Sequence, residues 1–543
     1  MPSRPADFTS DTARRSPRAH RRAPRLLLAL AGCALALALA PAALLPAASA
    51  QDLGHKAPPQ TRPVLINNAT VHTGVDGKVH APGYIIFQDG RITAVGAEPA
   101  PRVTDAVRVV DGTGLHVYPG LISPVTQLGL TELAAVRASN DMREVGTIKP
   151  EVVANLSVNP DSTLIPVARS NGILTVGVFP MGGLVSGRAS VLSLDGWTWE
   201  DMTVLADAGV AMNWPVTRTF SEWWMTRSED EQRSDTRRAT DELERMVQTA
   251  RAYYGARAAD PSATPEDLSW EAMRPVLGEP AHGDTPAKAP TRPLFVFAND
   301  IDQIQQAVAF GAAHGLKIVI VGGRDADRCA DLLKEHKVPV IIVGVHLMPR
   351  RADSPYDEAF TLPARLHAAG VEWALASGEE TPHERSLPYH AATAVAFGLP
   401  REAAIAAMTS GAARALGVEG ELGTLETGKR ATIILTTGDP LEITTRTRHA
   451  FIDGREIDLS NKQTALNEKY RERYRQMGEL TPASPAGAPD SERANTPGAP
   501  NSTPNGVAPG APGTPAATRP NQGTPTQNPA QRPPATAPAQ RER

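Results

Sequence analysis

Short apolar runs separated by turn residues dominate the chain between residues 63 and 118. Runs of this kind, rich in β-branched and aromatic side chains, are typical of strands. Asp89-Gly90 stands between two of the runs and predicts a tight hairpin, because glycine tolerates the positive φ that such a turn requires. We therefore expect a small β unit with strands over Val64–Asn67, Tyr84–Gln88, Arg91–Val95 and Val107–Val110.

From residue 119 to residue 417 the pattern changes, and apolar runs alternate with stretches of helical periodicity. This alternation predicts βα units around a parallel sheet, and a TIM-like (β/α)8 barrel is the economical way to close so many units. The fold class that we expect is α/β. The expected strands are Ile173–Phe179, Leu294–Ala298, Lys317–Val321, Pro339–Val343 and Glu372–Ala376. The expected helices are Asp302–His314, Ala326–His336, Tyr356–Ala369 and Leu387–Phe397.

A long polar insertion, 214–290, interrupts the barrel pattern. Within it, Ser228–Ala258 is charged and has apolar residues at helical spacing, which predicts an amphipathic helix. Such a helix fits a lid over the barrel or a peripheral helix on its outside, and the sequence leaves both open.

Turn-punctuated strands return over residues 418–458, at Ala431–Thr436 and His449–Ile452. The next segment, 459–480, contains a basic amphipathic helix over Lys462–Met477, which is more typical of a docking helix than of a membrane binder. Residues 481–543 are rich in Pro, Ala, Gly, Thr and Asn and nearly free of large apolar residues, so we expect this tail to be disordered.

Residues 1–50 are interpreted as a secretory signal peptide. Six arginines between residues 14 and 25 precede an apolar stretch from Leu26 to Leu45, and Ala48-Ser49-Ala50 forms an A-x-A cleavage site before Gln51. We expect an exported, periplasmic protein. Two alternatives remain: an uncleaved membrane anchor, and a lipoprotein, because Leu30-Ala31-Gly32-Cys33 resembles a lipobox.

Composition and charge narrow the classes of partner. The formal net charge of −4 supplies no basic field, so we expect no nucleic-acid partner. The two cysteines are Cys33 and Cys329, and removal of the signal would leave Cys329 alone, without an intrachain disulfide. The expected partners are a small-molecule ligand, the membrane only through an uncleaved signal or lipid anchor, and a second copy in a homo-oligomer.

Three motifs carry a family resemblance over residues 63–458: DGTGLHVYPGLI at 111–122, GGLVSGRASVLSLDGWTWEDM at 182–202, and LGVEGELGTLETGKRATIILTTGDPLE at 416–442. The chain resembles the amidohydrolase superfamily, in its imidazolonepropionase-like group. The resemblance implies a barrel from 119 to 417 beside a small composite β-sandwich built from both flanks, 51–118 and 418–458. It also implies a hydrolase acting on C–N bonds in non-peptide or cyclic amides.

The same resemblance implies a divalent metal such as zinc, bound by histidines and an aspartate. The family's His-x-His positions hold Val125 and Gln127 here, and its histidines on strands five and six fall near Phe297 and Gly322. No His-x-His occurs in the chain, and no lysine lies between residues 149 and 288 that could serve as a carbamylated bridge. We therefore expect no metal cofactor.

The strand-eight carboxylate, which is also the family's proton acceptor, corresponds to Glu379. Glu379 is our candidate catalytic residue, although a solvated acidic loop would have the same composition. The candidate substrate-binding residues are Gln127, Asn299, His346 and His383. Two functions follow as hypotheses: a hydrolase with altered chemistry around Glu379, and a non-catalytic exported ligand-binding or partner subunit, a pseudoenzyme.

Overall fold

The computed structural model describes residues 55–102, 104, 106–221, 225–279, 281, 286–378 and 380–479. The predicted signal peptide, the predicted disordered tail and Glu379 lie outside the described residues. Among the described residues, no helix combines the length and apolar character needed to cross a membrane.

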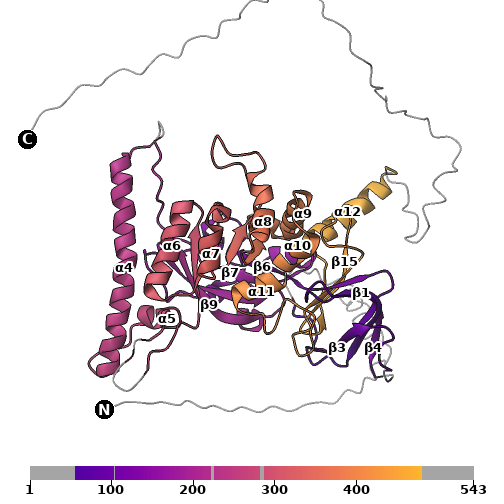
Figure 1. The fold of residues 1–543 in the computed structure, drawn as a ribbon. Helices are drawn as coiled ribbons and strands as arrows, with labels where there is room; N and C mark the ends of the chain where they lie inside the picture. The colour runs from indigo at the N-terminus through magenta and orange to yellow at the C-terminus, as the bar shows by residue number, and fades with distance from the viewer. Residues whose placement is uncertain are drawn as a thin grey trace, which may run out of the picture. The chain divides into compact units, whose positions relative to one another are not determined.

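A nearly closed eight-stranded sheet forms the centre of the fold, in the order β13-β12-β11-β10-β9-β8-β7-β6, and β13 packs back against β6. Figure 1 shows these strands surrounded by helices. The architecture is an α/β barrel. The strands are β6 (Leu121–Thr126), β7 (Ile173–Val178), β8 (Val185–Ser193), β9 (Thr203–Asn213), β10 (Leu294–Ala298), β11 (Ile318–Gly322), β12 (Val340–Val343) and β13 (Trp373–Ala376).

The expectation of a wholly parallel sheet is wrong at one strand, because β8 runs antiparallel to both β7 and β9. The connection from β7 to β8 comprises only residues 179–184, and a parallel crossover needs a dozen or more residues. The short connection therefore forces the chain to reverse. The other neighbouring pairs in the sheet, β6–β7 and β9 through β13, are parallel.

Helices and helical turns lie in the connections between barrel strands, and η4, α9, α10 and α11 follow the last barrel strand, β13. They are η1 (Arg137–Ser139), η2 (Ala154–Ser157), α2 (Leu164–Arg169), α3 (Trp199–Met202), α4 (Glu229–Ala259), α5 (Leu268–Leu277), α6 (Ile301–His314), η3 (Ala326–Cys329), α7 (Ala330–Glu335), α8 (Glu358–Ala368), η4 (Thr381–Ser386), α9 (Leu387–Ala396), α10 (Arg401–Ala407) and α11 (Ser410–Leu416). A further helix, α12 (Lys462–Gln476), has no buried side chain.

The insertion helix α4 is peripheral rather than a lid. Its apolar stripe, from Leu243 to Tyr254, is buried in the same core cluster as the outward-facing residues of the barrel strands. Arg251 of α4 also donates a hydrogen bond of 2.7 Å to the carbonyl of His314 at the end of α6. Figure 1 shows α4 upright beside α6 and α5.

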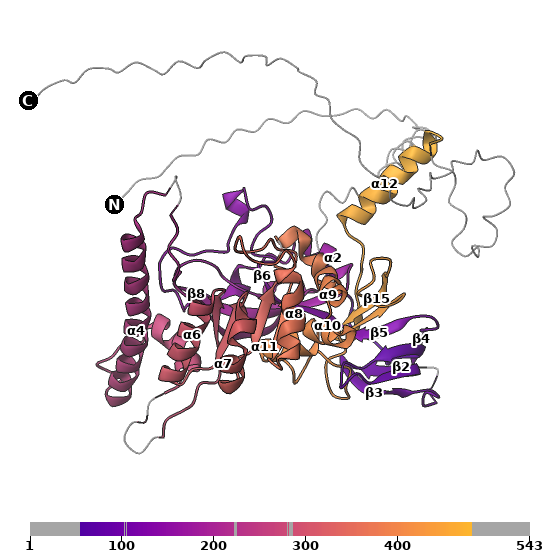
Figure 2. The same ribbon diagram turned by 45° about the horizontal axis from the view of Figure 1, so that its top comes forward.

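Strands from both flanks of the chain join in a second sheet, with the order β16-β15-β14-β5-β1-β2-β3, and β4 pairs with β1. In Figure 2 the indigo N-terminal strands and the C-terminal β15 lie in the same part of the molecule. These strands form one hydrogen-bonded sheet, and their arrangement as a sandwich stays a prediction. They are β1 (Val64–His72), β2 (Val79–Gln88), β3 (Arg91–Ala97), β4 (Arg108–Asp111), β5 (His116–Pro119), β14 (Ile433–Thr436), β15 (Thr447–Ile452) and β16 (Arg455–Glu456).

The hairpin predicted at Asp89-Gly90 is present between β2 and β3. Asp89 has a φ of 51° and Gly90 a φ of 78°, the left-handed values that a two-residue hairpin turn requires.

Candidate functional site

Four of the predicted site residues lie at the carboxyl end of the barrel, which we call the barrel mouth. Gln127 follows β6, Asn299 follows β10, His346 lies beyond the end of β12, and His383 lies in η4 after β13. Catalytic residues of α/β barrels come from this end. Glu379 follows β13 in the sequence, and its side chain lies outside the described residues.

The positions that correspond to the family's metal ligands lie among apolar side chains. Val125 is 6% exposed and belongs to the cluster that fills the barrel interior. Phe297 packs against the same cluster and meets the ring of Phe179 edge-on, with 6.0 Å between ring centroids and 80° between ring planes. A hydrocarbon side chain has no lone pair with which to bind an ion, so neither position supplies a metal ligand.

Asn299 occupies the space beside Gly322. A Cβ atom on Gly322 would lie 2.5 Å from Asn299 Oδ1, so a larger residue there requires the amide to move. The backbone of Asn299 is held on both sides: its N–H donates to Gln303 Oε1 at 3.0 Å, and its carbonyl accepts from Arg350 Nη1 at 3.0 Å. Asn299 is thus a fixed polar group of the mouth.

Two arginines and two aspartates form an ion-pair network across the ends of β10, β11 and β12. Arg350 Nη2 lies 2.5 Å from Asp300 Oδ1, and Arg351 binds Asp325 with two nitrogens, at 3.0 and 2.5 Å. Glu358 extends the network by accepting a hydrogen bond of 3.0 Å from the Arg350 N–H. Since Asp300 and Asp325 are buried, each carboxylate depends on its guanidinium partner for compensation.

The charge balance of this network shifts the pKa of Asp325 downward. Burial alone would raise it, but the hydrogen bonds and positive charge of Arg351, the Ile301 N–H and the charge of Arg350 together hold it below the usual value. The carboxylate therefore stays ionised. This network was not predicted from the sequence, in which two consecutive arginines shortly after an apolar strand were the available signal.

His346 turns toward helix α9. Its ring stacks on that of His390, with 4.0 Å between centroids, and its Nε2 lies 2.8 Å from Thr393 Oγ1. His390 is buried and its Nδ1 accepts the Val345 N–H at 3.1 Å. The imidazole of His346 is exposed, and these contacts fix its orientation.

A second polar group that the sequence analysis missed is Glu384, the residue after the exposed His383. Glu384 is 1% exposed, and its carboxylate accepts hydrogen bonds from Ser123 Oγ at 2.5 Å and Thr126 Oγ1 at 2.6 Å. Both hydroxyls belong to β6. The carboxylate thus ties η4 to the strand where the family has its His-x-His pair.

The residues at the family's metal-ligand positions can be compared with what a divalent ion requires. Among the residues that the structure describes, no three His, Cys, Asp or Glu side chains are placed to hold a metal ion together. The family's histidine positions hold a valine, a glutamine, a phenylalanine and a glycine, of which only Gln127 has a side-chain oxygen, whereas Glu379 keeps a carboxylate at the strand-eight position. These residues do not fit the divalent ion of the family.

Comparisons with known proteins agree with this architecture. A model of the amidohydrolase family matches residues 299–463. The chain is similar to amidohydrolase tasK of Hapsidospora irregularis, with 23% identity over 441 residues, which cover 72% of this chain and 43% of that protein. It is 31% identical over 152 residues to the imidazolonepropionase of Maricaulis maris, over 27% of this chain and 36% of the relative. The matches thus span less than half the length of these relatives.

Among solved structures, an amidohydrolase from Thermotoga maritima superposes with a TM-score of 0.59 and 24% identity, covering 73% of this chain and 99% of that one. This likeness concerns the fold. The family match over residues 299–463 and the imidazolonepropionase relatives support the resemblance of this chain to the amidohydrolase family.

Proposed function

We propose that this chain is an amidohydrolase-family protein that binds a small amide or cyclic amide at the barrel mouth without metal-dependent hydrolysis. Resemblance to the family supports a hydrolase acting on C–N bonds as its class. One observation carries the departure from that class: the family's ligand positions hold Val125, Gln127, Phe297 and Gly322.

The physical reason is the need for an activated water. In the family's reaction a bound ion lowers the pKa of water to about 7 and polarises the carbonyl. Without the family's imidazole ligands neither effect is available. What the mouth retains are polar groups, and among them the side-chain amide of Asn299 beside Gly322 suits hydrogen bonding to an amide.

A second candidate function is hydrolysis without a metal. It is favoured by Glu379, because this residue keeps a carboxylate at the position of the family's proton acceptor. A carboxylate can act as a general base on water or as a general acid toward a leaving nitrogen.

A panel of succinimide, hydantoin, dihydrouracil and simple N-acyl amines separates the two functions. Binding is measured by thermal shift and calorimetry, and product by chromatography, with zinc, with manganese and with EDTA. We expect binding without product. Product that requires metal contradicts both candidates. Product in EDTA that disappears in Glu379→Gln, but not in the control Glu380→Gln, establishes the second candidate and overturns the first.

We also propose that the protein is exported to the periplasm. Support comes from the basic, apolar and A-x-A segments of residues 1–50. N-terminal sequencing of the mature protein tests this, and we expect a start at Gln51. A lipid-modified Cys33 or an intact N-terminus would contradict it.

A further inference from the structure

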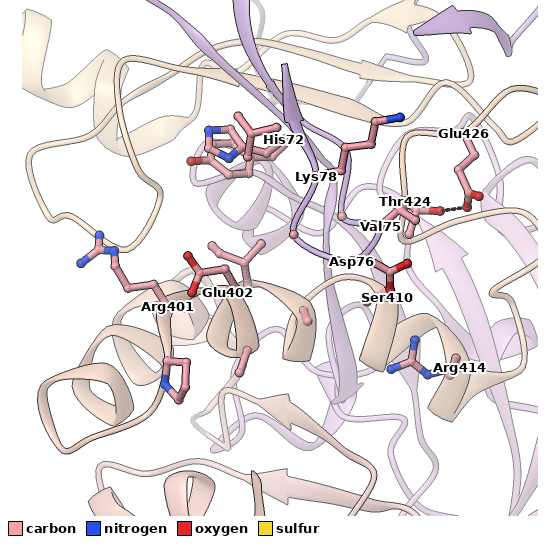
Figure 3. A pocket seen from close by; sticks show the side chains of 18 of the residues that line it. His72, Val75, Asp76, Lys78, Arg401, Glu402, Ser410, Arg414, Thr424 and Glu426 are labelled. Carbon is pink, nitrogen blue, oxygen red and sulfur yellow. Dashed lines mark hydrogen bonds between the residues drawn. The ribbon is translucent and has the colours of Figure 1, made fainter. Parts of the chain in front are cut away.

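We propose that a cavity between the flanking sheet and helices α10 and α11 binds a small zwitterion with a planar ring, such as an aromatic amino acid. The cavity has a volume of about 740 Å³, within the range of small-molecule sites. Figure 3 shows it with His72 on one side, Arg401 and Glu402 of α10 opposite, and Arg414 of α11 below. It is separate from the barrel mouth, and no residue of the predicted site lines it.

The wall from the flanking sheet is aromatic. The rings of His72 and Tyr118 stack in parallel, with 4.2 Å between centroids and 8° between planes. His72 is held further by a hydrogen bond of 3.0 Å between its Nε2 and His116 Nδ1. Aromatic rings pack favourably against aromatic side chains in edge-on or offset arrangements, and a neutral imidazole does not repel a positive group beside it. Burial, and next the charge of His116, lower the pKa of His72 to about 4, so it is neutral at pH 7.

The wall from the helices is aliphatic. Ala403, Ile405 and Ala406 of α10 line the cavity, together with Leu422 beyond α11. Small and branched hydrocarbon side chains opposite an aromatic wall leave a slot whose two faces are both apolar. The body of a ligand buried there should therefore be flat and uncharged.

The charged side chains around the cavity indicate which charges a ligand should carry. Two ion pairs, Arg401–Asp439 and Lys429–Glu426, are formed within the lining itself. Within the part of the chain that the structure describes, the other five charged lining residues have no ion-pair partner within 4.0 Å. They are Lys78, Arg414, Asp76, Glu402 and Glu419.

Both signs of charge thus remain available at one cavity. A purely anionic ligand would meet the acidic side chains unpaired, and a purely cationic ligand would meet Lys78 and Arg414. A zwitterion can place its carboxylate near the guanidinium of Arg414 and its ammonium near one of the acidic side chains that line the cavity. Charge-assisted hydrogen bonds of this kind are stronger than neutral ones.

The loop that closes one side of the cavity is fixed before any ligand arrives. Thr73 Oγ1 donates to the Lys78 carbonyl at 3.0 Å and accepts the Val75 N–H at 3.2 Å. The Leu425 N–H donates to the Thr73 carbonyl at 2.7 Å, which joins this loop to the segment carrying Thr424 and Glu426. A preformed wall reduces the entropy lost on binding.

Calorimetric titration of the full chain with L-tryptophan tests the proposal. Three matched probes each lack one feature: tryptamine lacks the carboxylate, indole-3-acetate lacks the ammonium, and L-leucine lacks the ring. We expect saturable binding of L-tryptophan and about tenfold or greater weakening for each of the other probes, the factor that corresponds to 1.4 kcal/mol. Absence of saturable L-tryptophan binding, or equal binding of all four, would overturn the proposal.

Two variants locate the binding. Ala406→Trp fills the cavity and should abolish L-tryptophan binding. Arg414→Ala should weaken binding of L-tryptophan and indole-3-acetate but leave that of tryptamine unchanged, and because Arg414 is exposed the variant should fold. Arg137→Ala, an exposed arginine on η1, is the control. Tryptophan affinity unchanged in Arg414→Ala contradicts the proposal. Asn299→Ala at the barrel mouth should leave tryptophan affinity intact. Amide binding at the mouth and tryptophan binding at the cavity can therefore fail independently of each other.

Discussion

The barrel mouth and the cavity beside the flanking sheet both carry charged side chains, but they use them differently. At the mouth, Arg350 and Arg351 are paired with Asp300 and Asp325, whose carboxylates are buried. At the cavity, Arg414 and Lys78 are exposed and have no ion pair within the described part of the chain.

The charged side chains of the mouth therefore stabilise the fold, whereas those of the cavity can interact with a ligand. A buried pair is worth little net stability but is costly to break, because removal of one partner leaves the other charge uncompensated. An exposed charge without a partner costs little to remove and is free to meet a ligand. At the barrel mouth the charged side chains compensate one another. The following predictions test this contrast, from the largest expected effect to the smallest.

Asp325→Ala should give the largest loss, because it leaves Arg351 half-buried without its bidentate partner. We expect the free energy of unfolding to fall by about 3–5 kcal/mol in urea denaturation. The control is Asp331→Ala, whose fully exposed carboxylate pairs with Lys334 on the surface, and it should leave stability unchanged. Equal effects of the two substitutions would contradict the structural role of the network.

Glu384→Ala should cost about 3 kcal/mol, because hydrogen bonds to a charged group contribute about 1.5–3 kcal/mol each and two buried hydroxyls lose their acceptor. Those hydroxyls are on Ser123 and Thr126. Thermal and urea unfolding measure the loss. Glu380→Ala, an exposed glutamate in the same segment, is the matched control, and a loss as large there would refute the assignment.

Acid should weaken the network less than substitution does. The folded-state pKa of Asp325 lies below its usual 3.8, so its contribution to stability is complete above that pH and is lost as the pH falls through the lower folded value. The wild type should therefore lose stability below about pH 4, and Asp325→Asn should show a shallower decline over the same window. Parallel declines of the two proteins would show that Asp325 is not the titrating group.

Removal of one arginine side chain should change the stability of the protein least at the cavity. Arg351→Ala at the mouth should destabilise the protein clearly, whereas Arg414→Ala should cause no measurable change in the midpoint of urea unfolding. The reverse order would invalidate the contrast between the two regions.

Much of the fold follows from hydrophobic periodicity. The strand predicted at Leu294–Ala298 is observed with the same ends, and the helix predicted over Asp302–His314 begins one residue earlier, at Ile301. These elements have strong local signals, a buried apolar run and a helical stripe. The antiparallel β8 could not be seen in this way, because strand direction depends on the length of a connection and on pairing across the sheet.

The site was harder to predict, because its polar side chains bind partners that are far away in the sequence. Asp300 directly precedes α6, and nothing in the local sequence marks it as a residue of the site. That Asp300 binds Arg350, fifty positions away, depends on how β10 and β12 align. Glu384 likewise meets Ser123 only when η4 folds over β6. By contrast, the residues at the family's ligand positions, such as Val125 and Phe297, can be named from the sequence alone because they depend on residue identity, and the absence of a metal there stays a prediction.

The most direct test of the central claim is the metal content of the purified protein. We predict that elemental analysis after exposure to zinc and to manganese will find no stoichiometric ion, and that EDTA will leave the unfolding midpoint unchanged. One equivalent of zinc or manganese per chain, removed by EDTA and absent from a Gln127→Ala variant, would contradict the account and restore a metal centre to the barrel mouth.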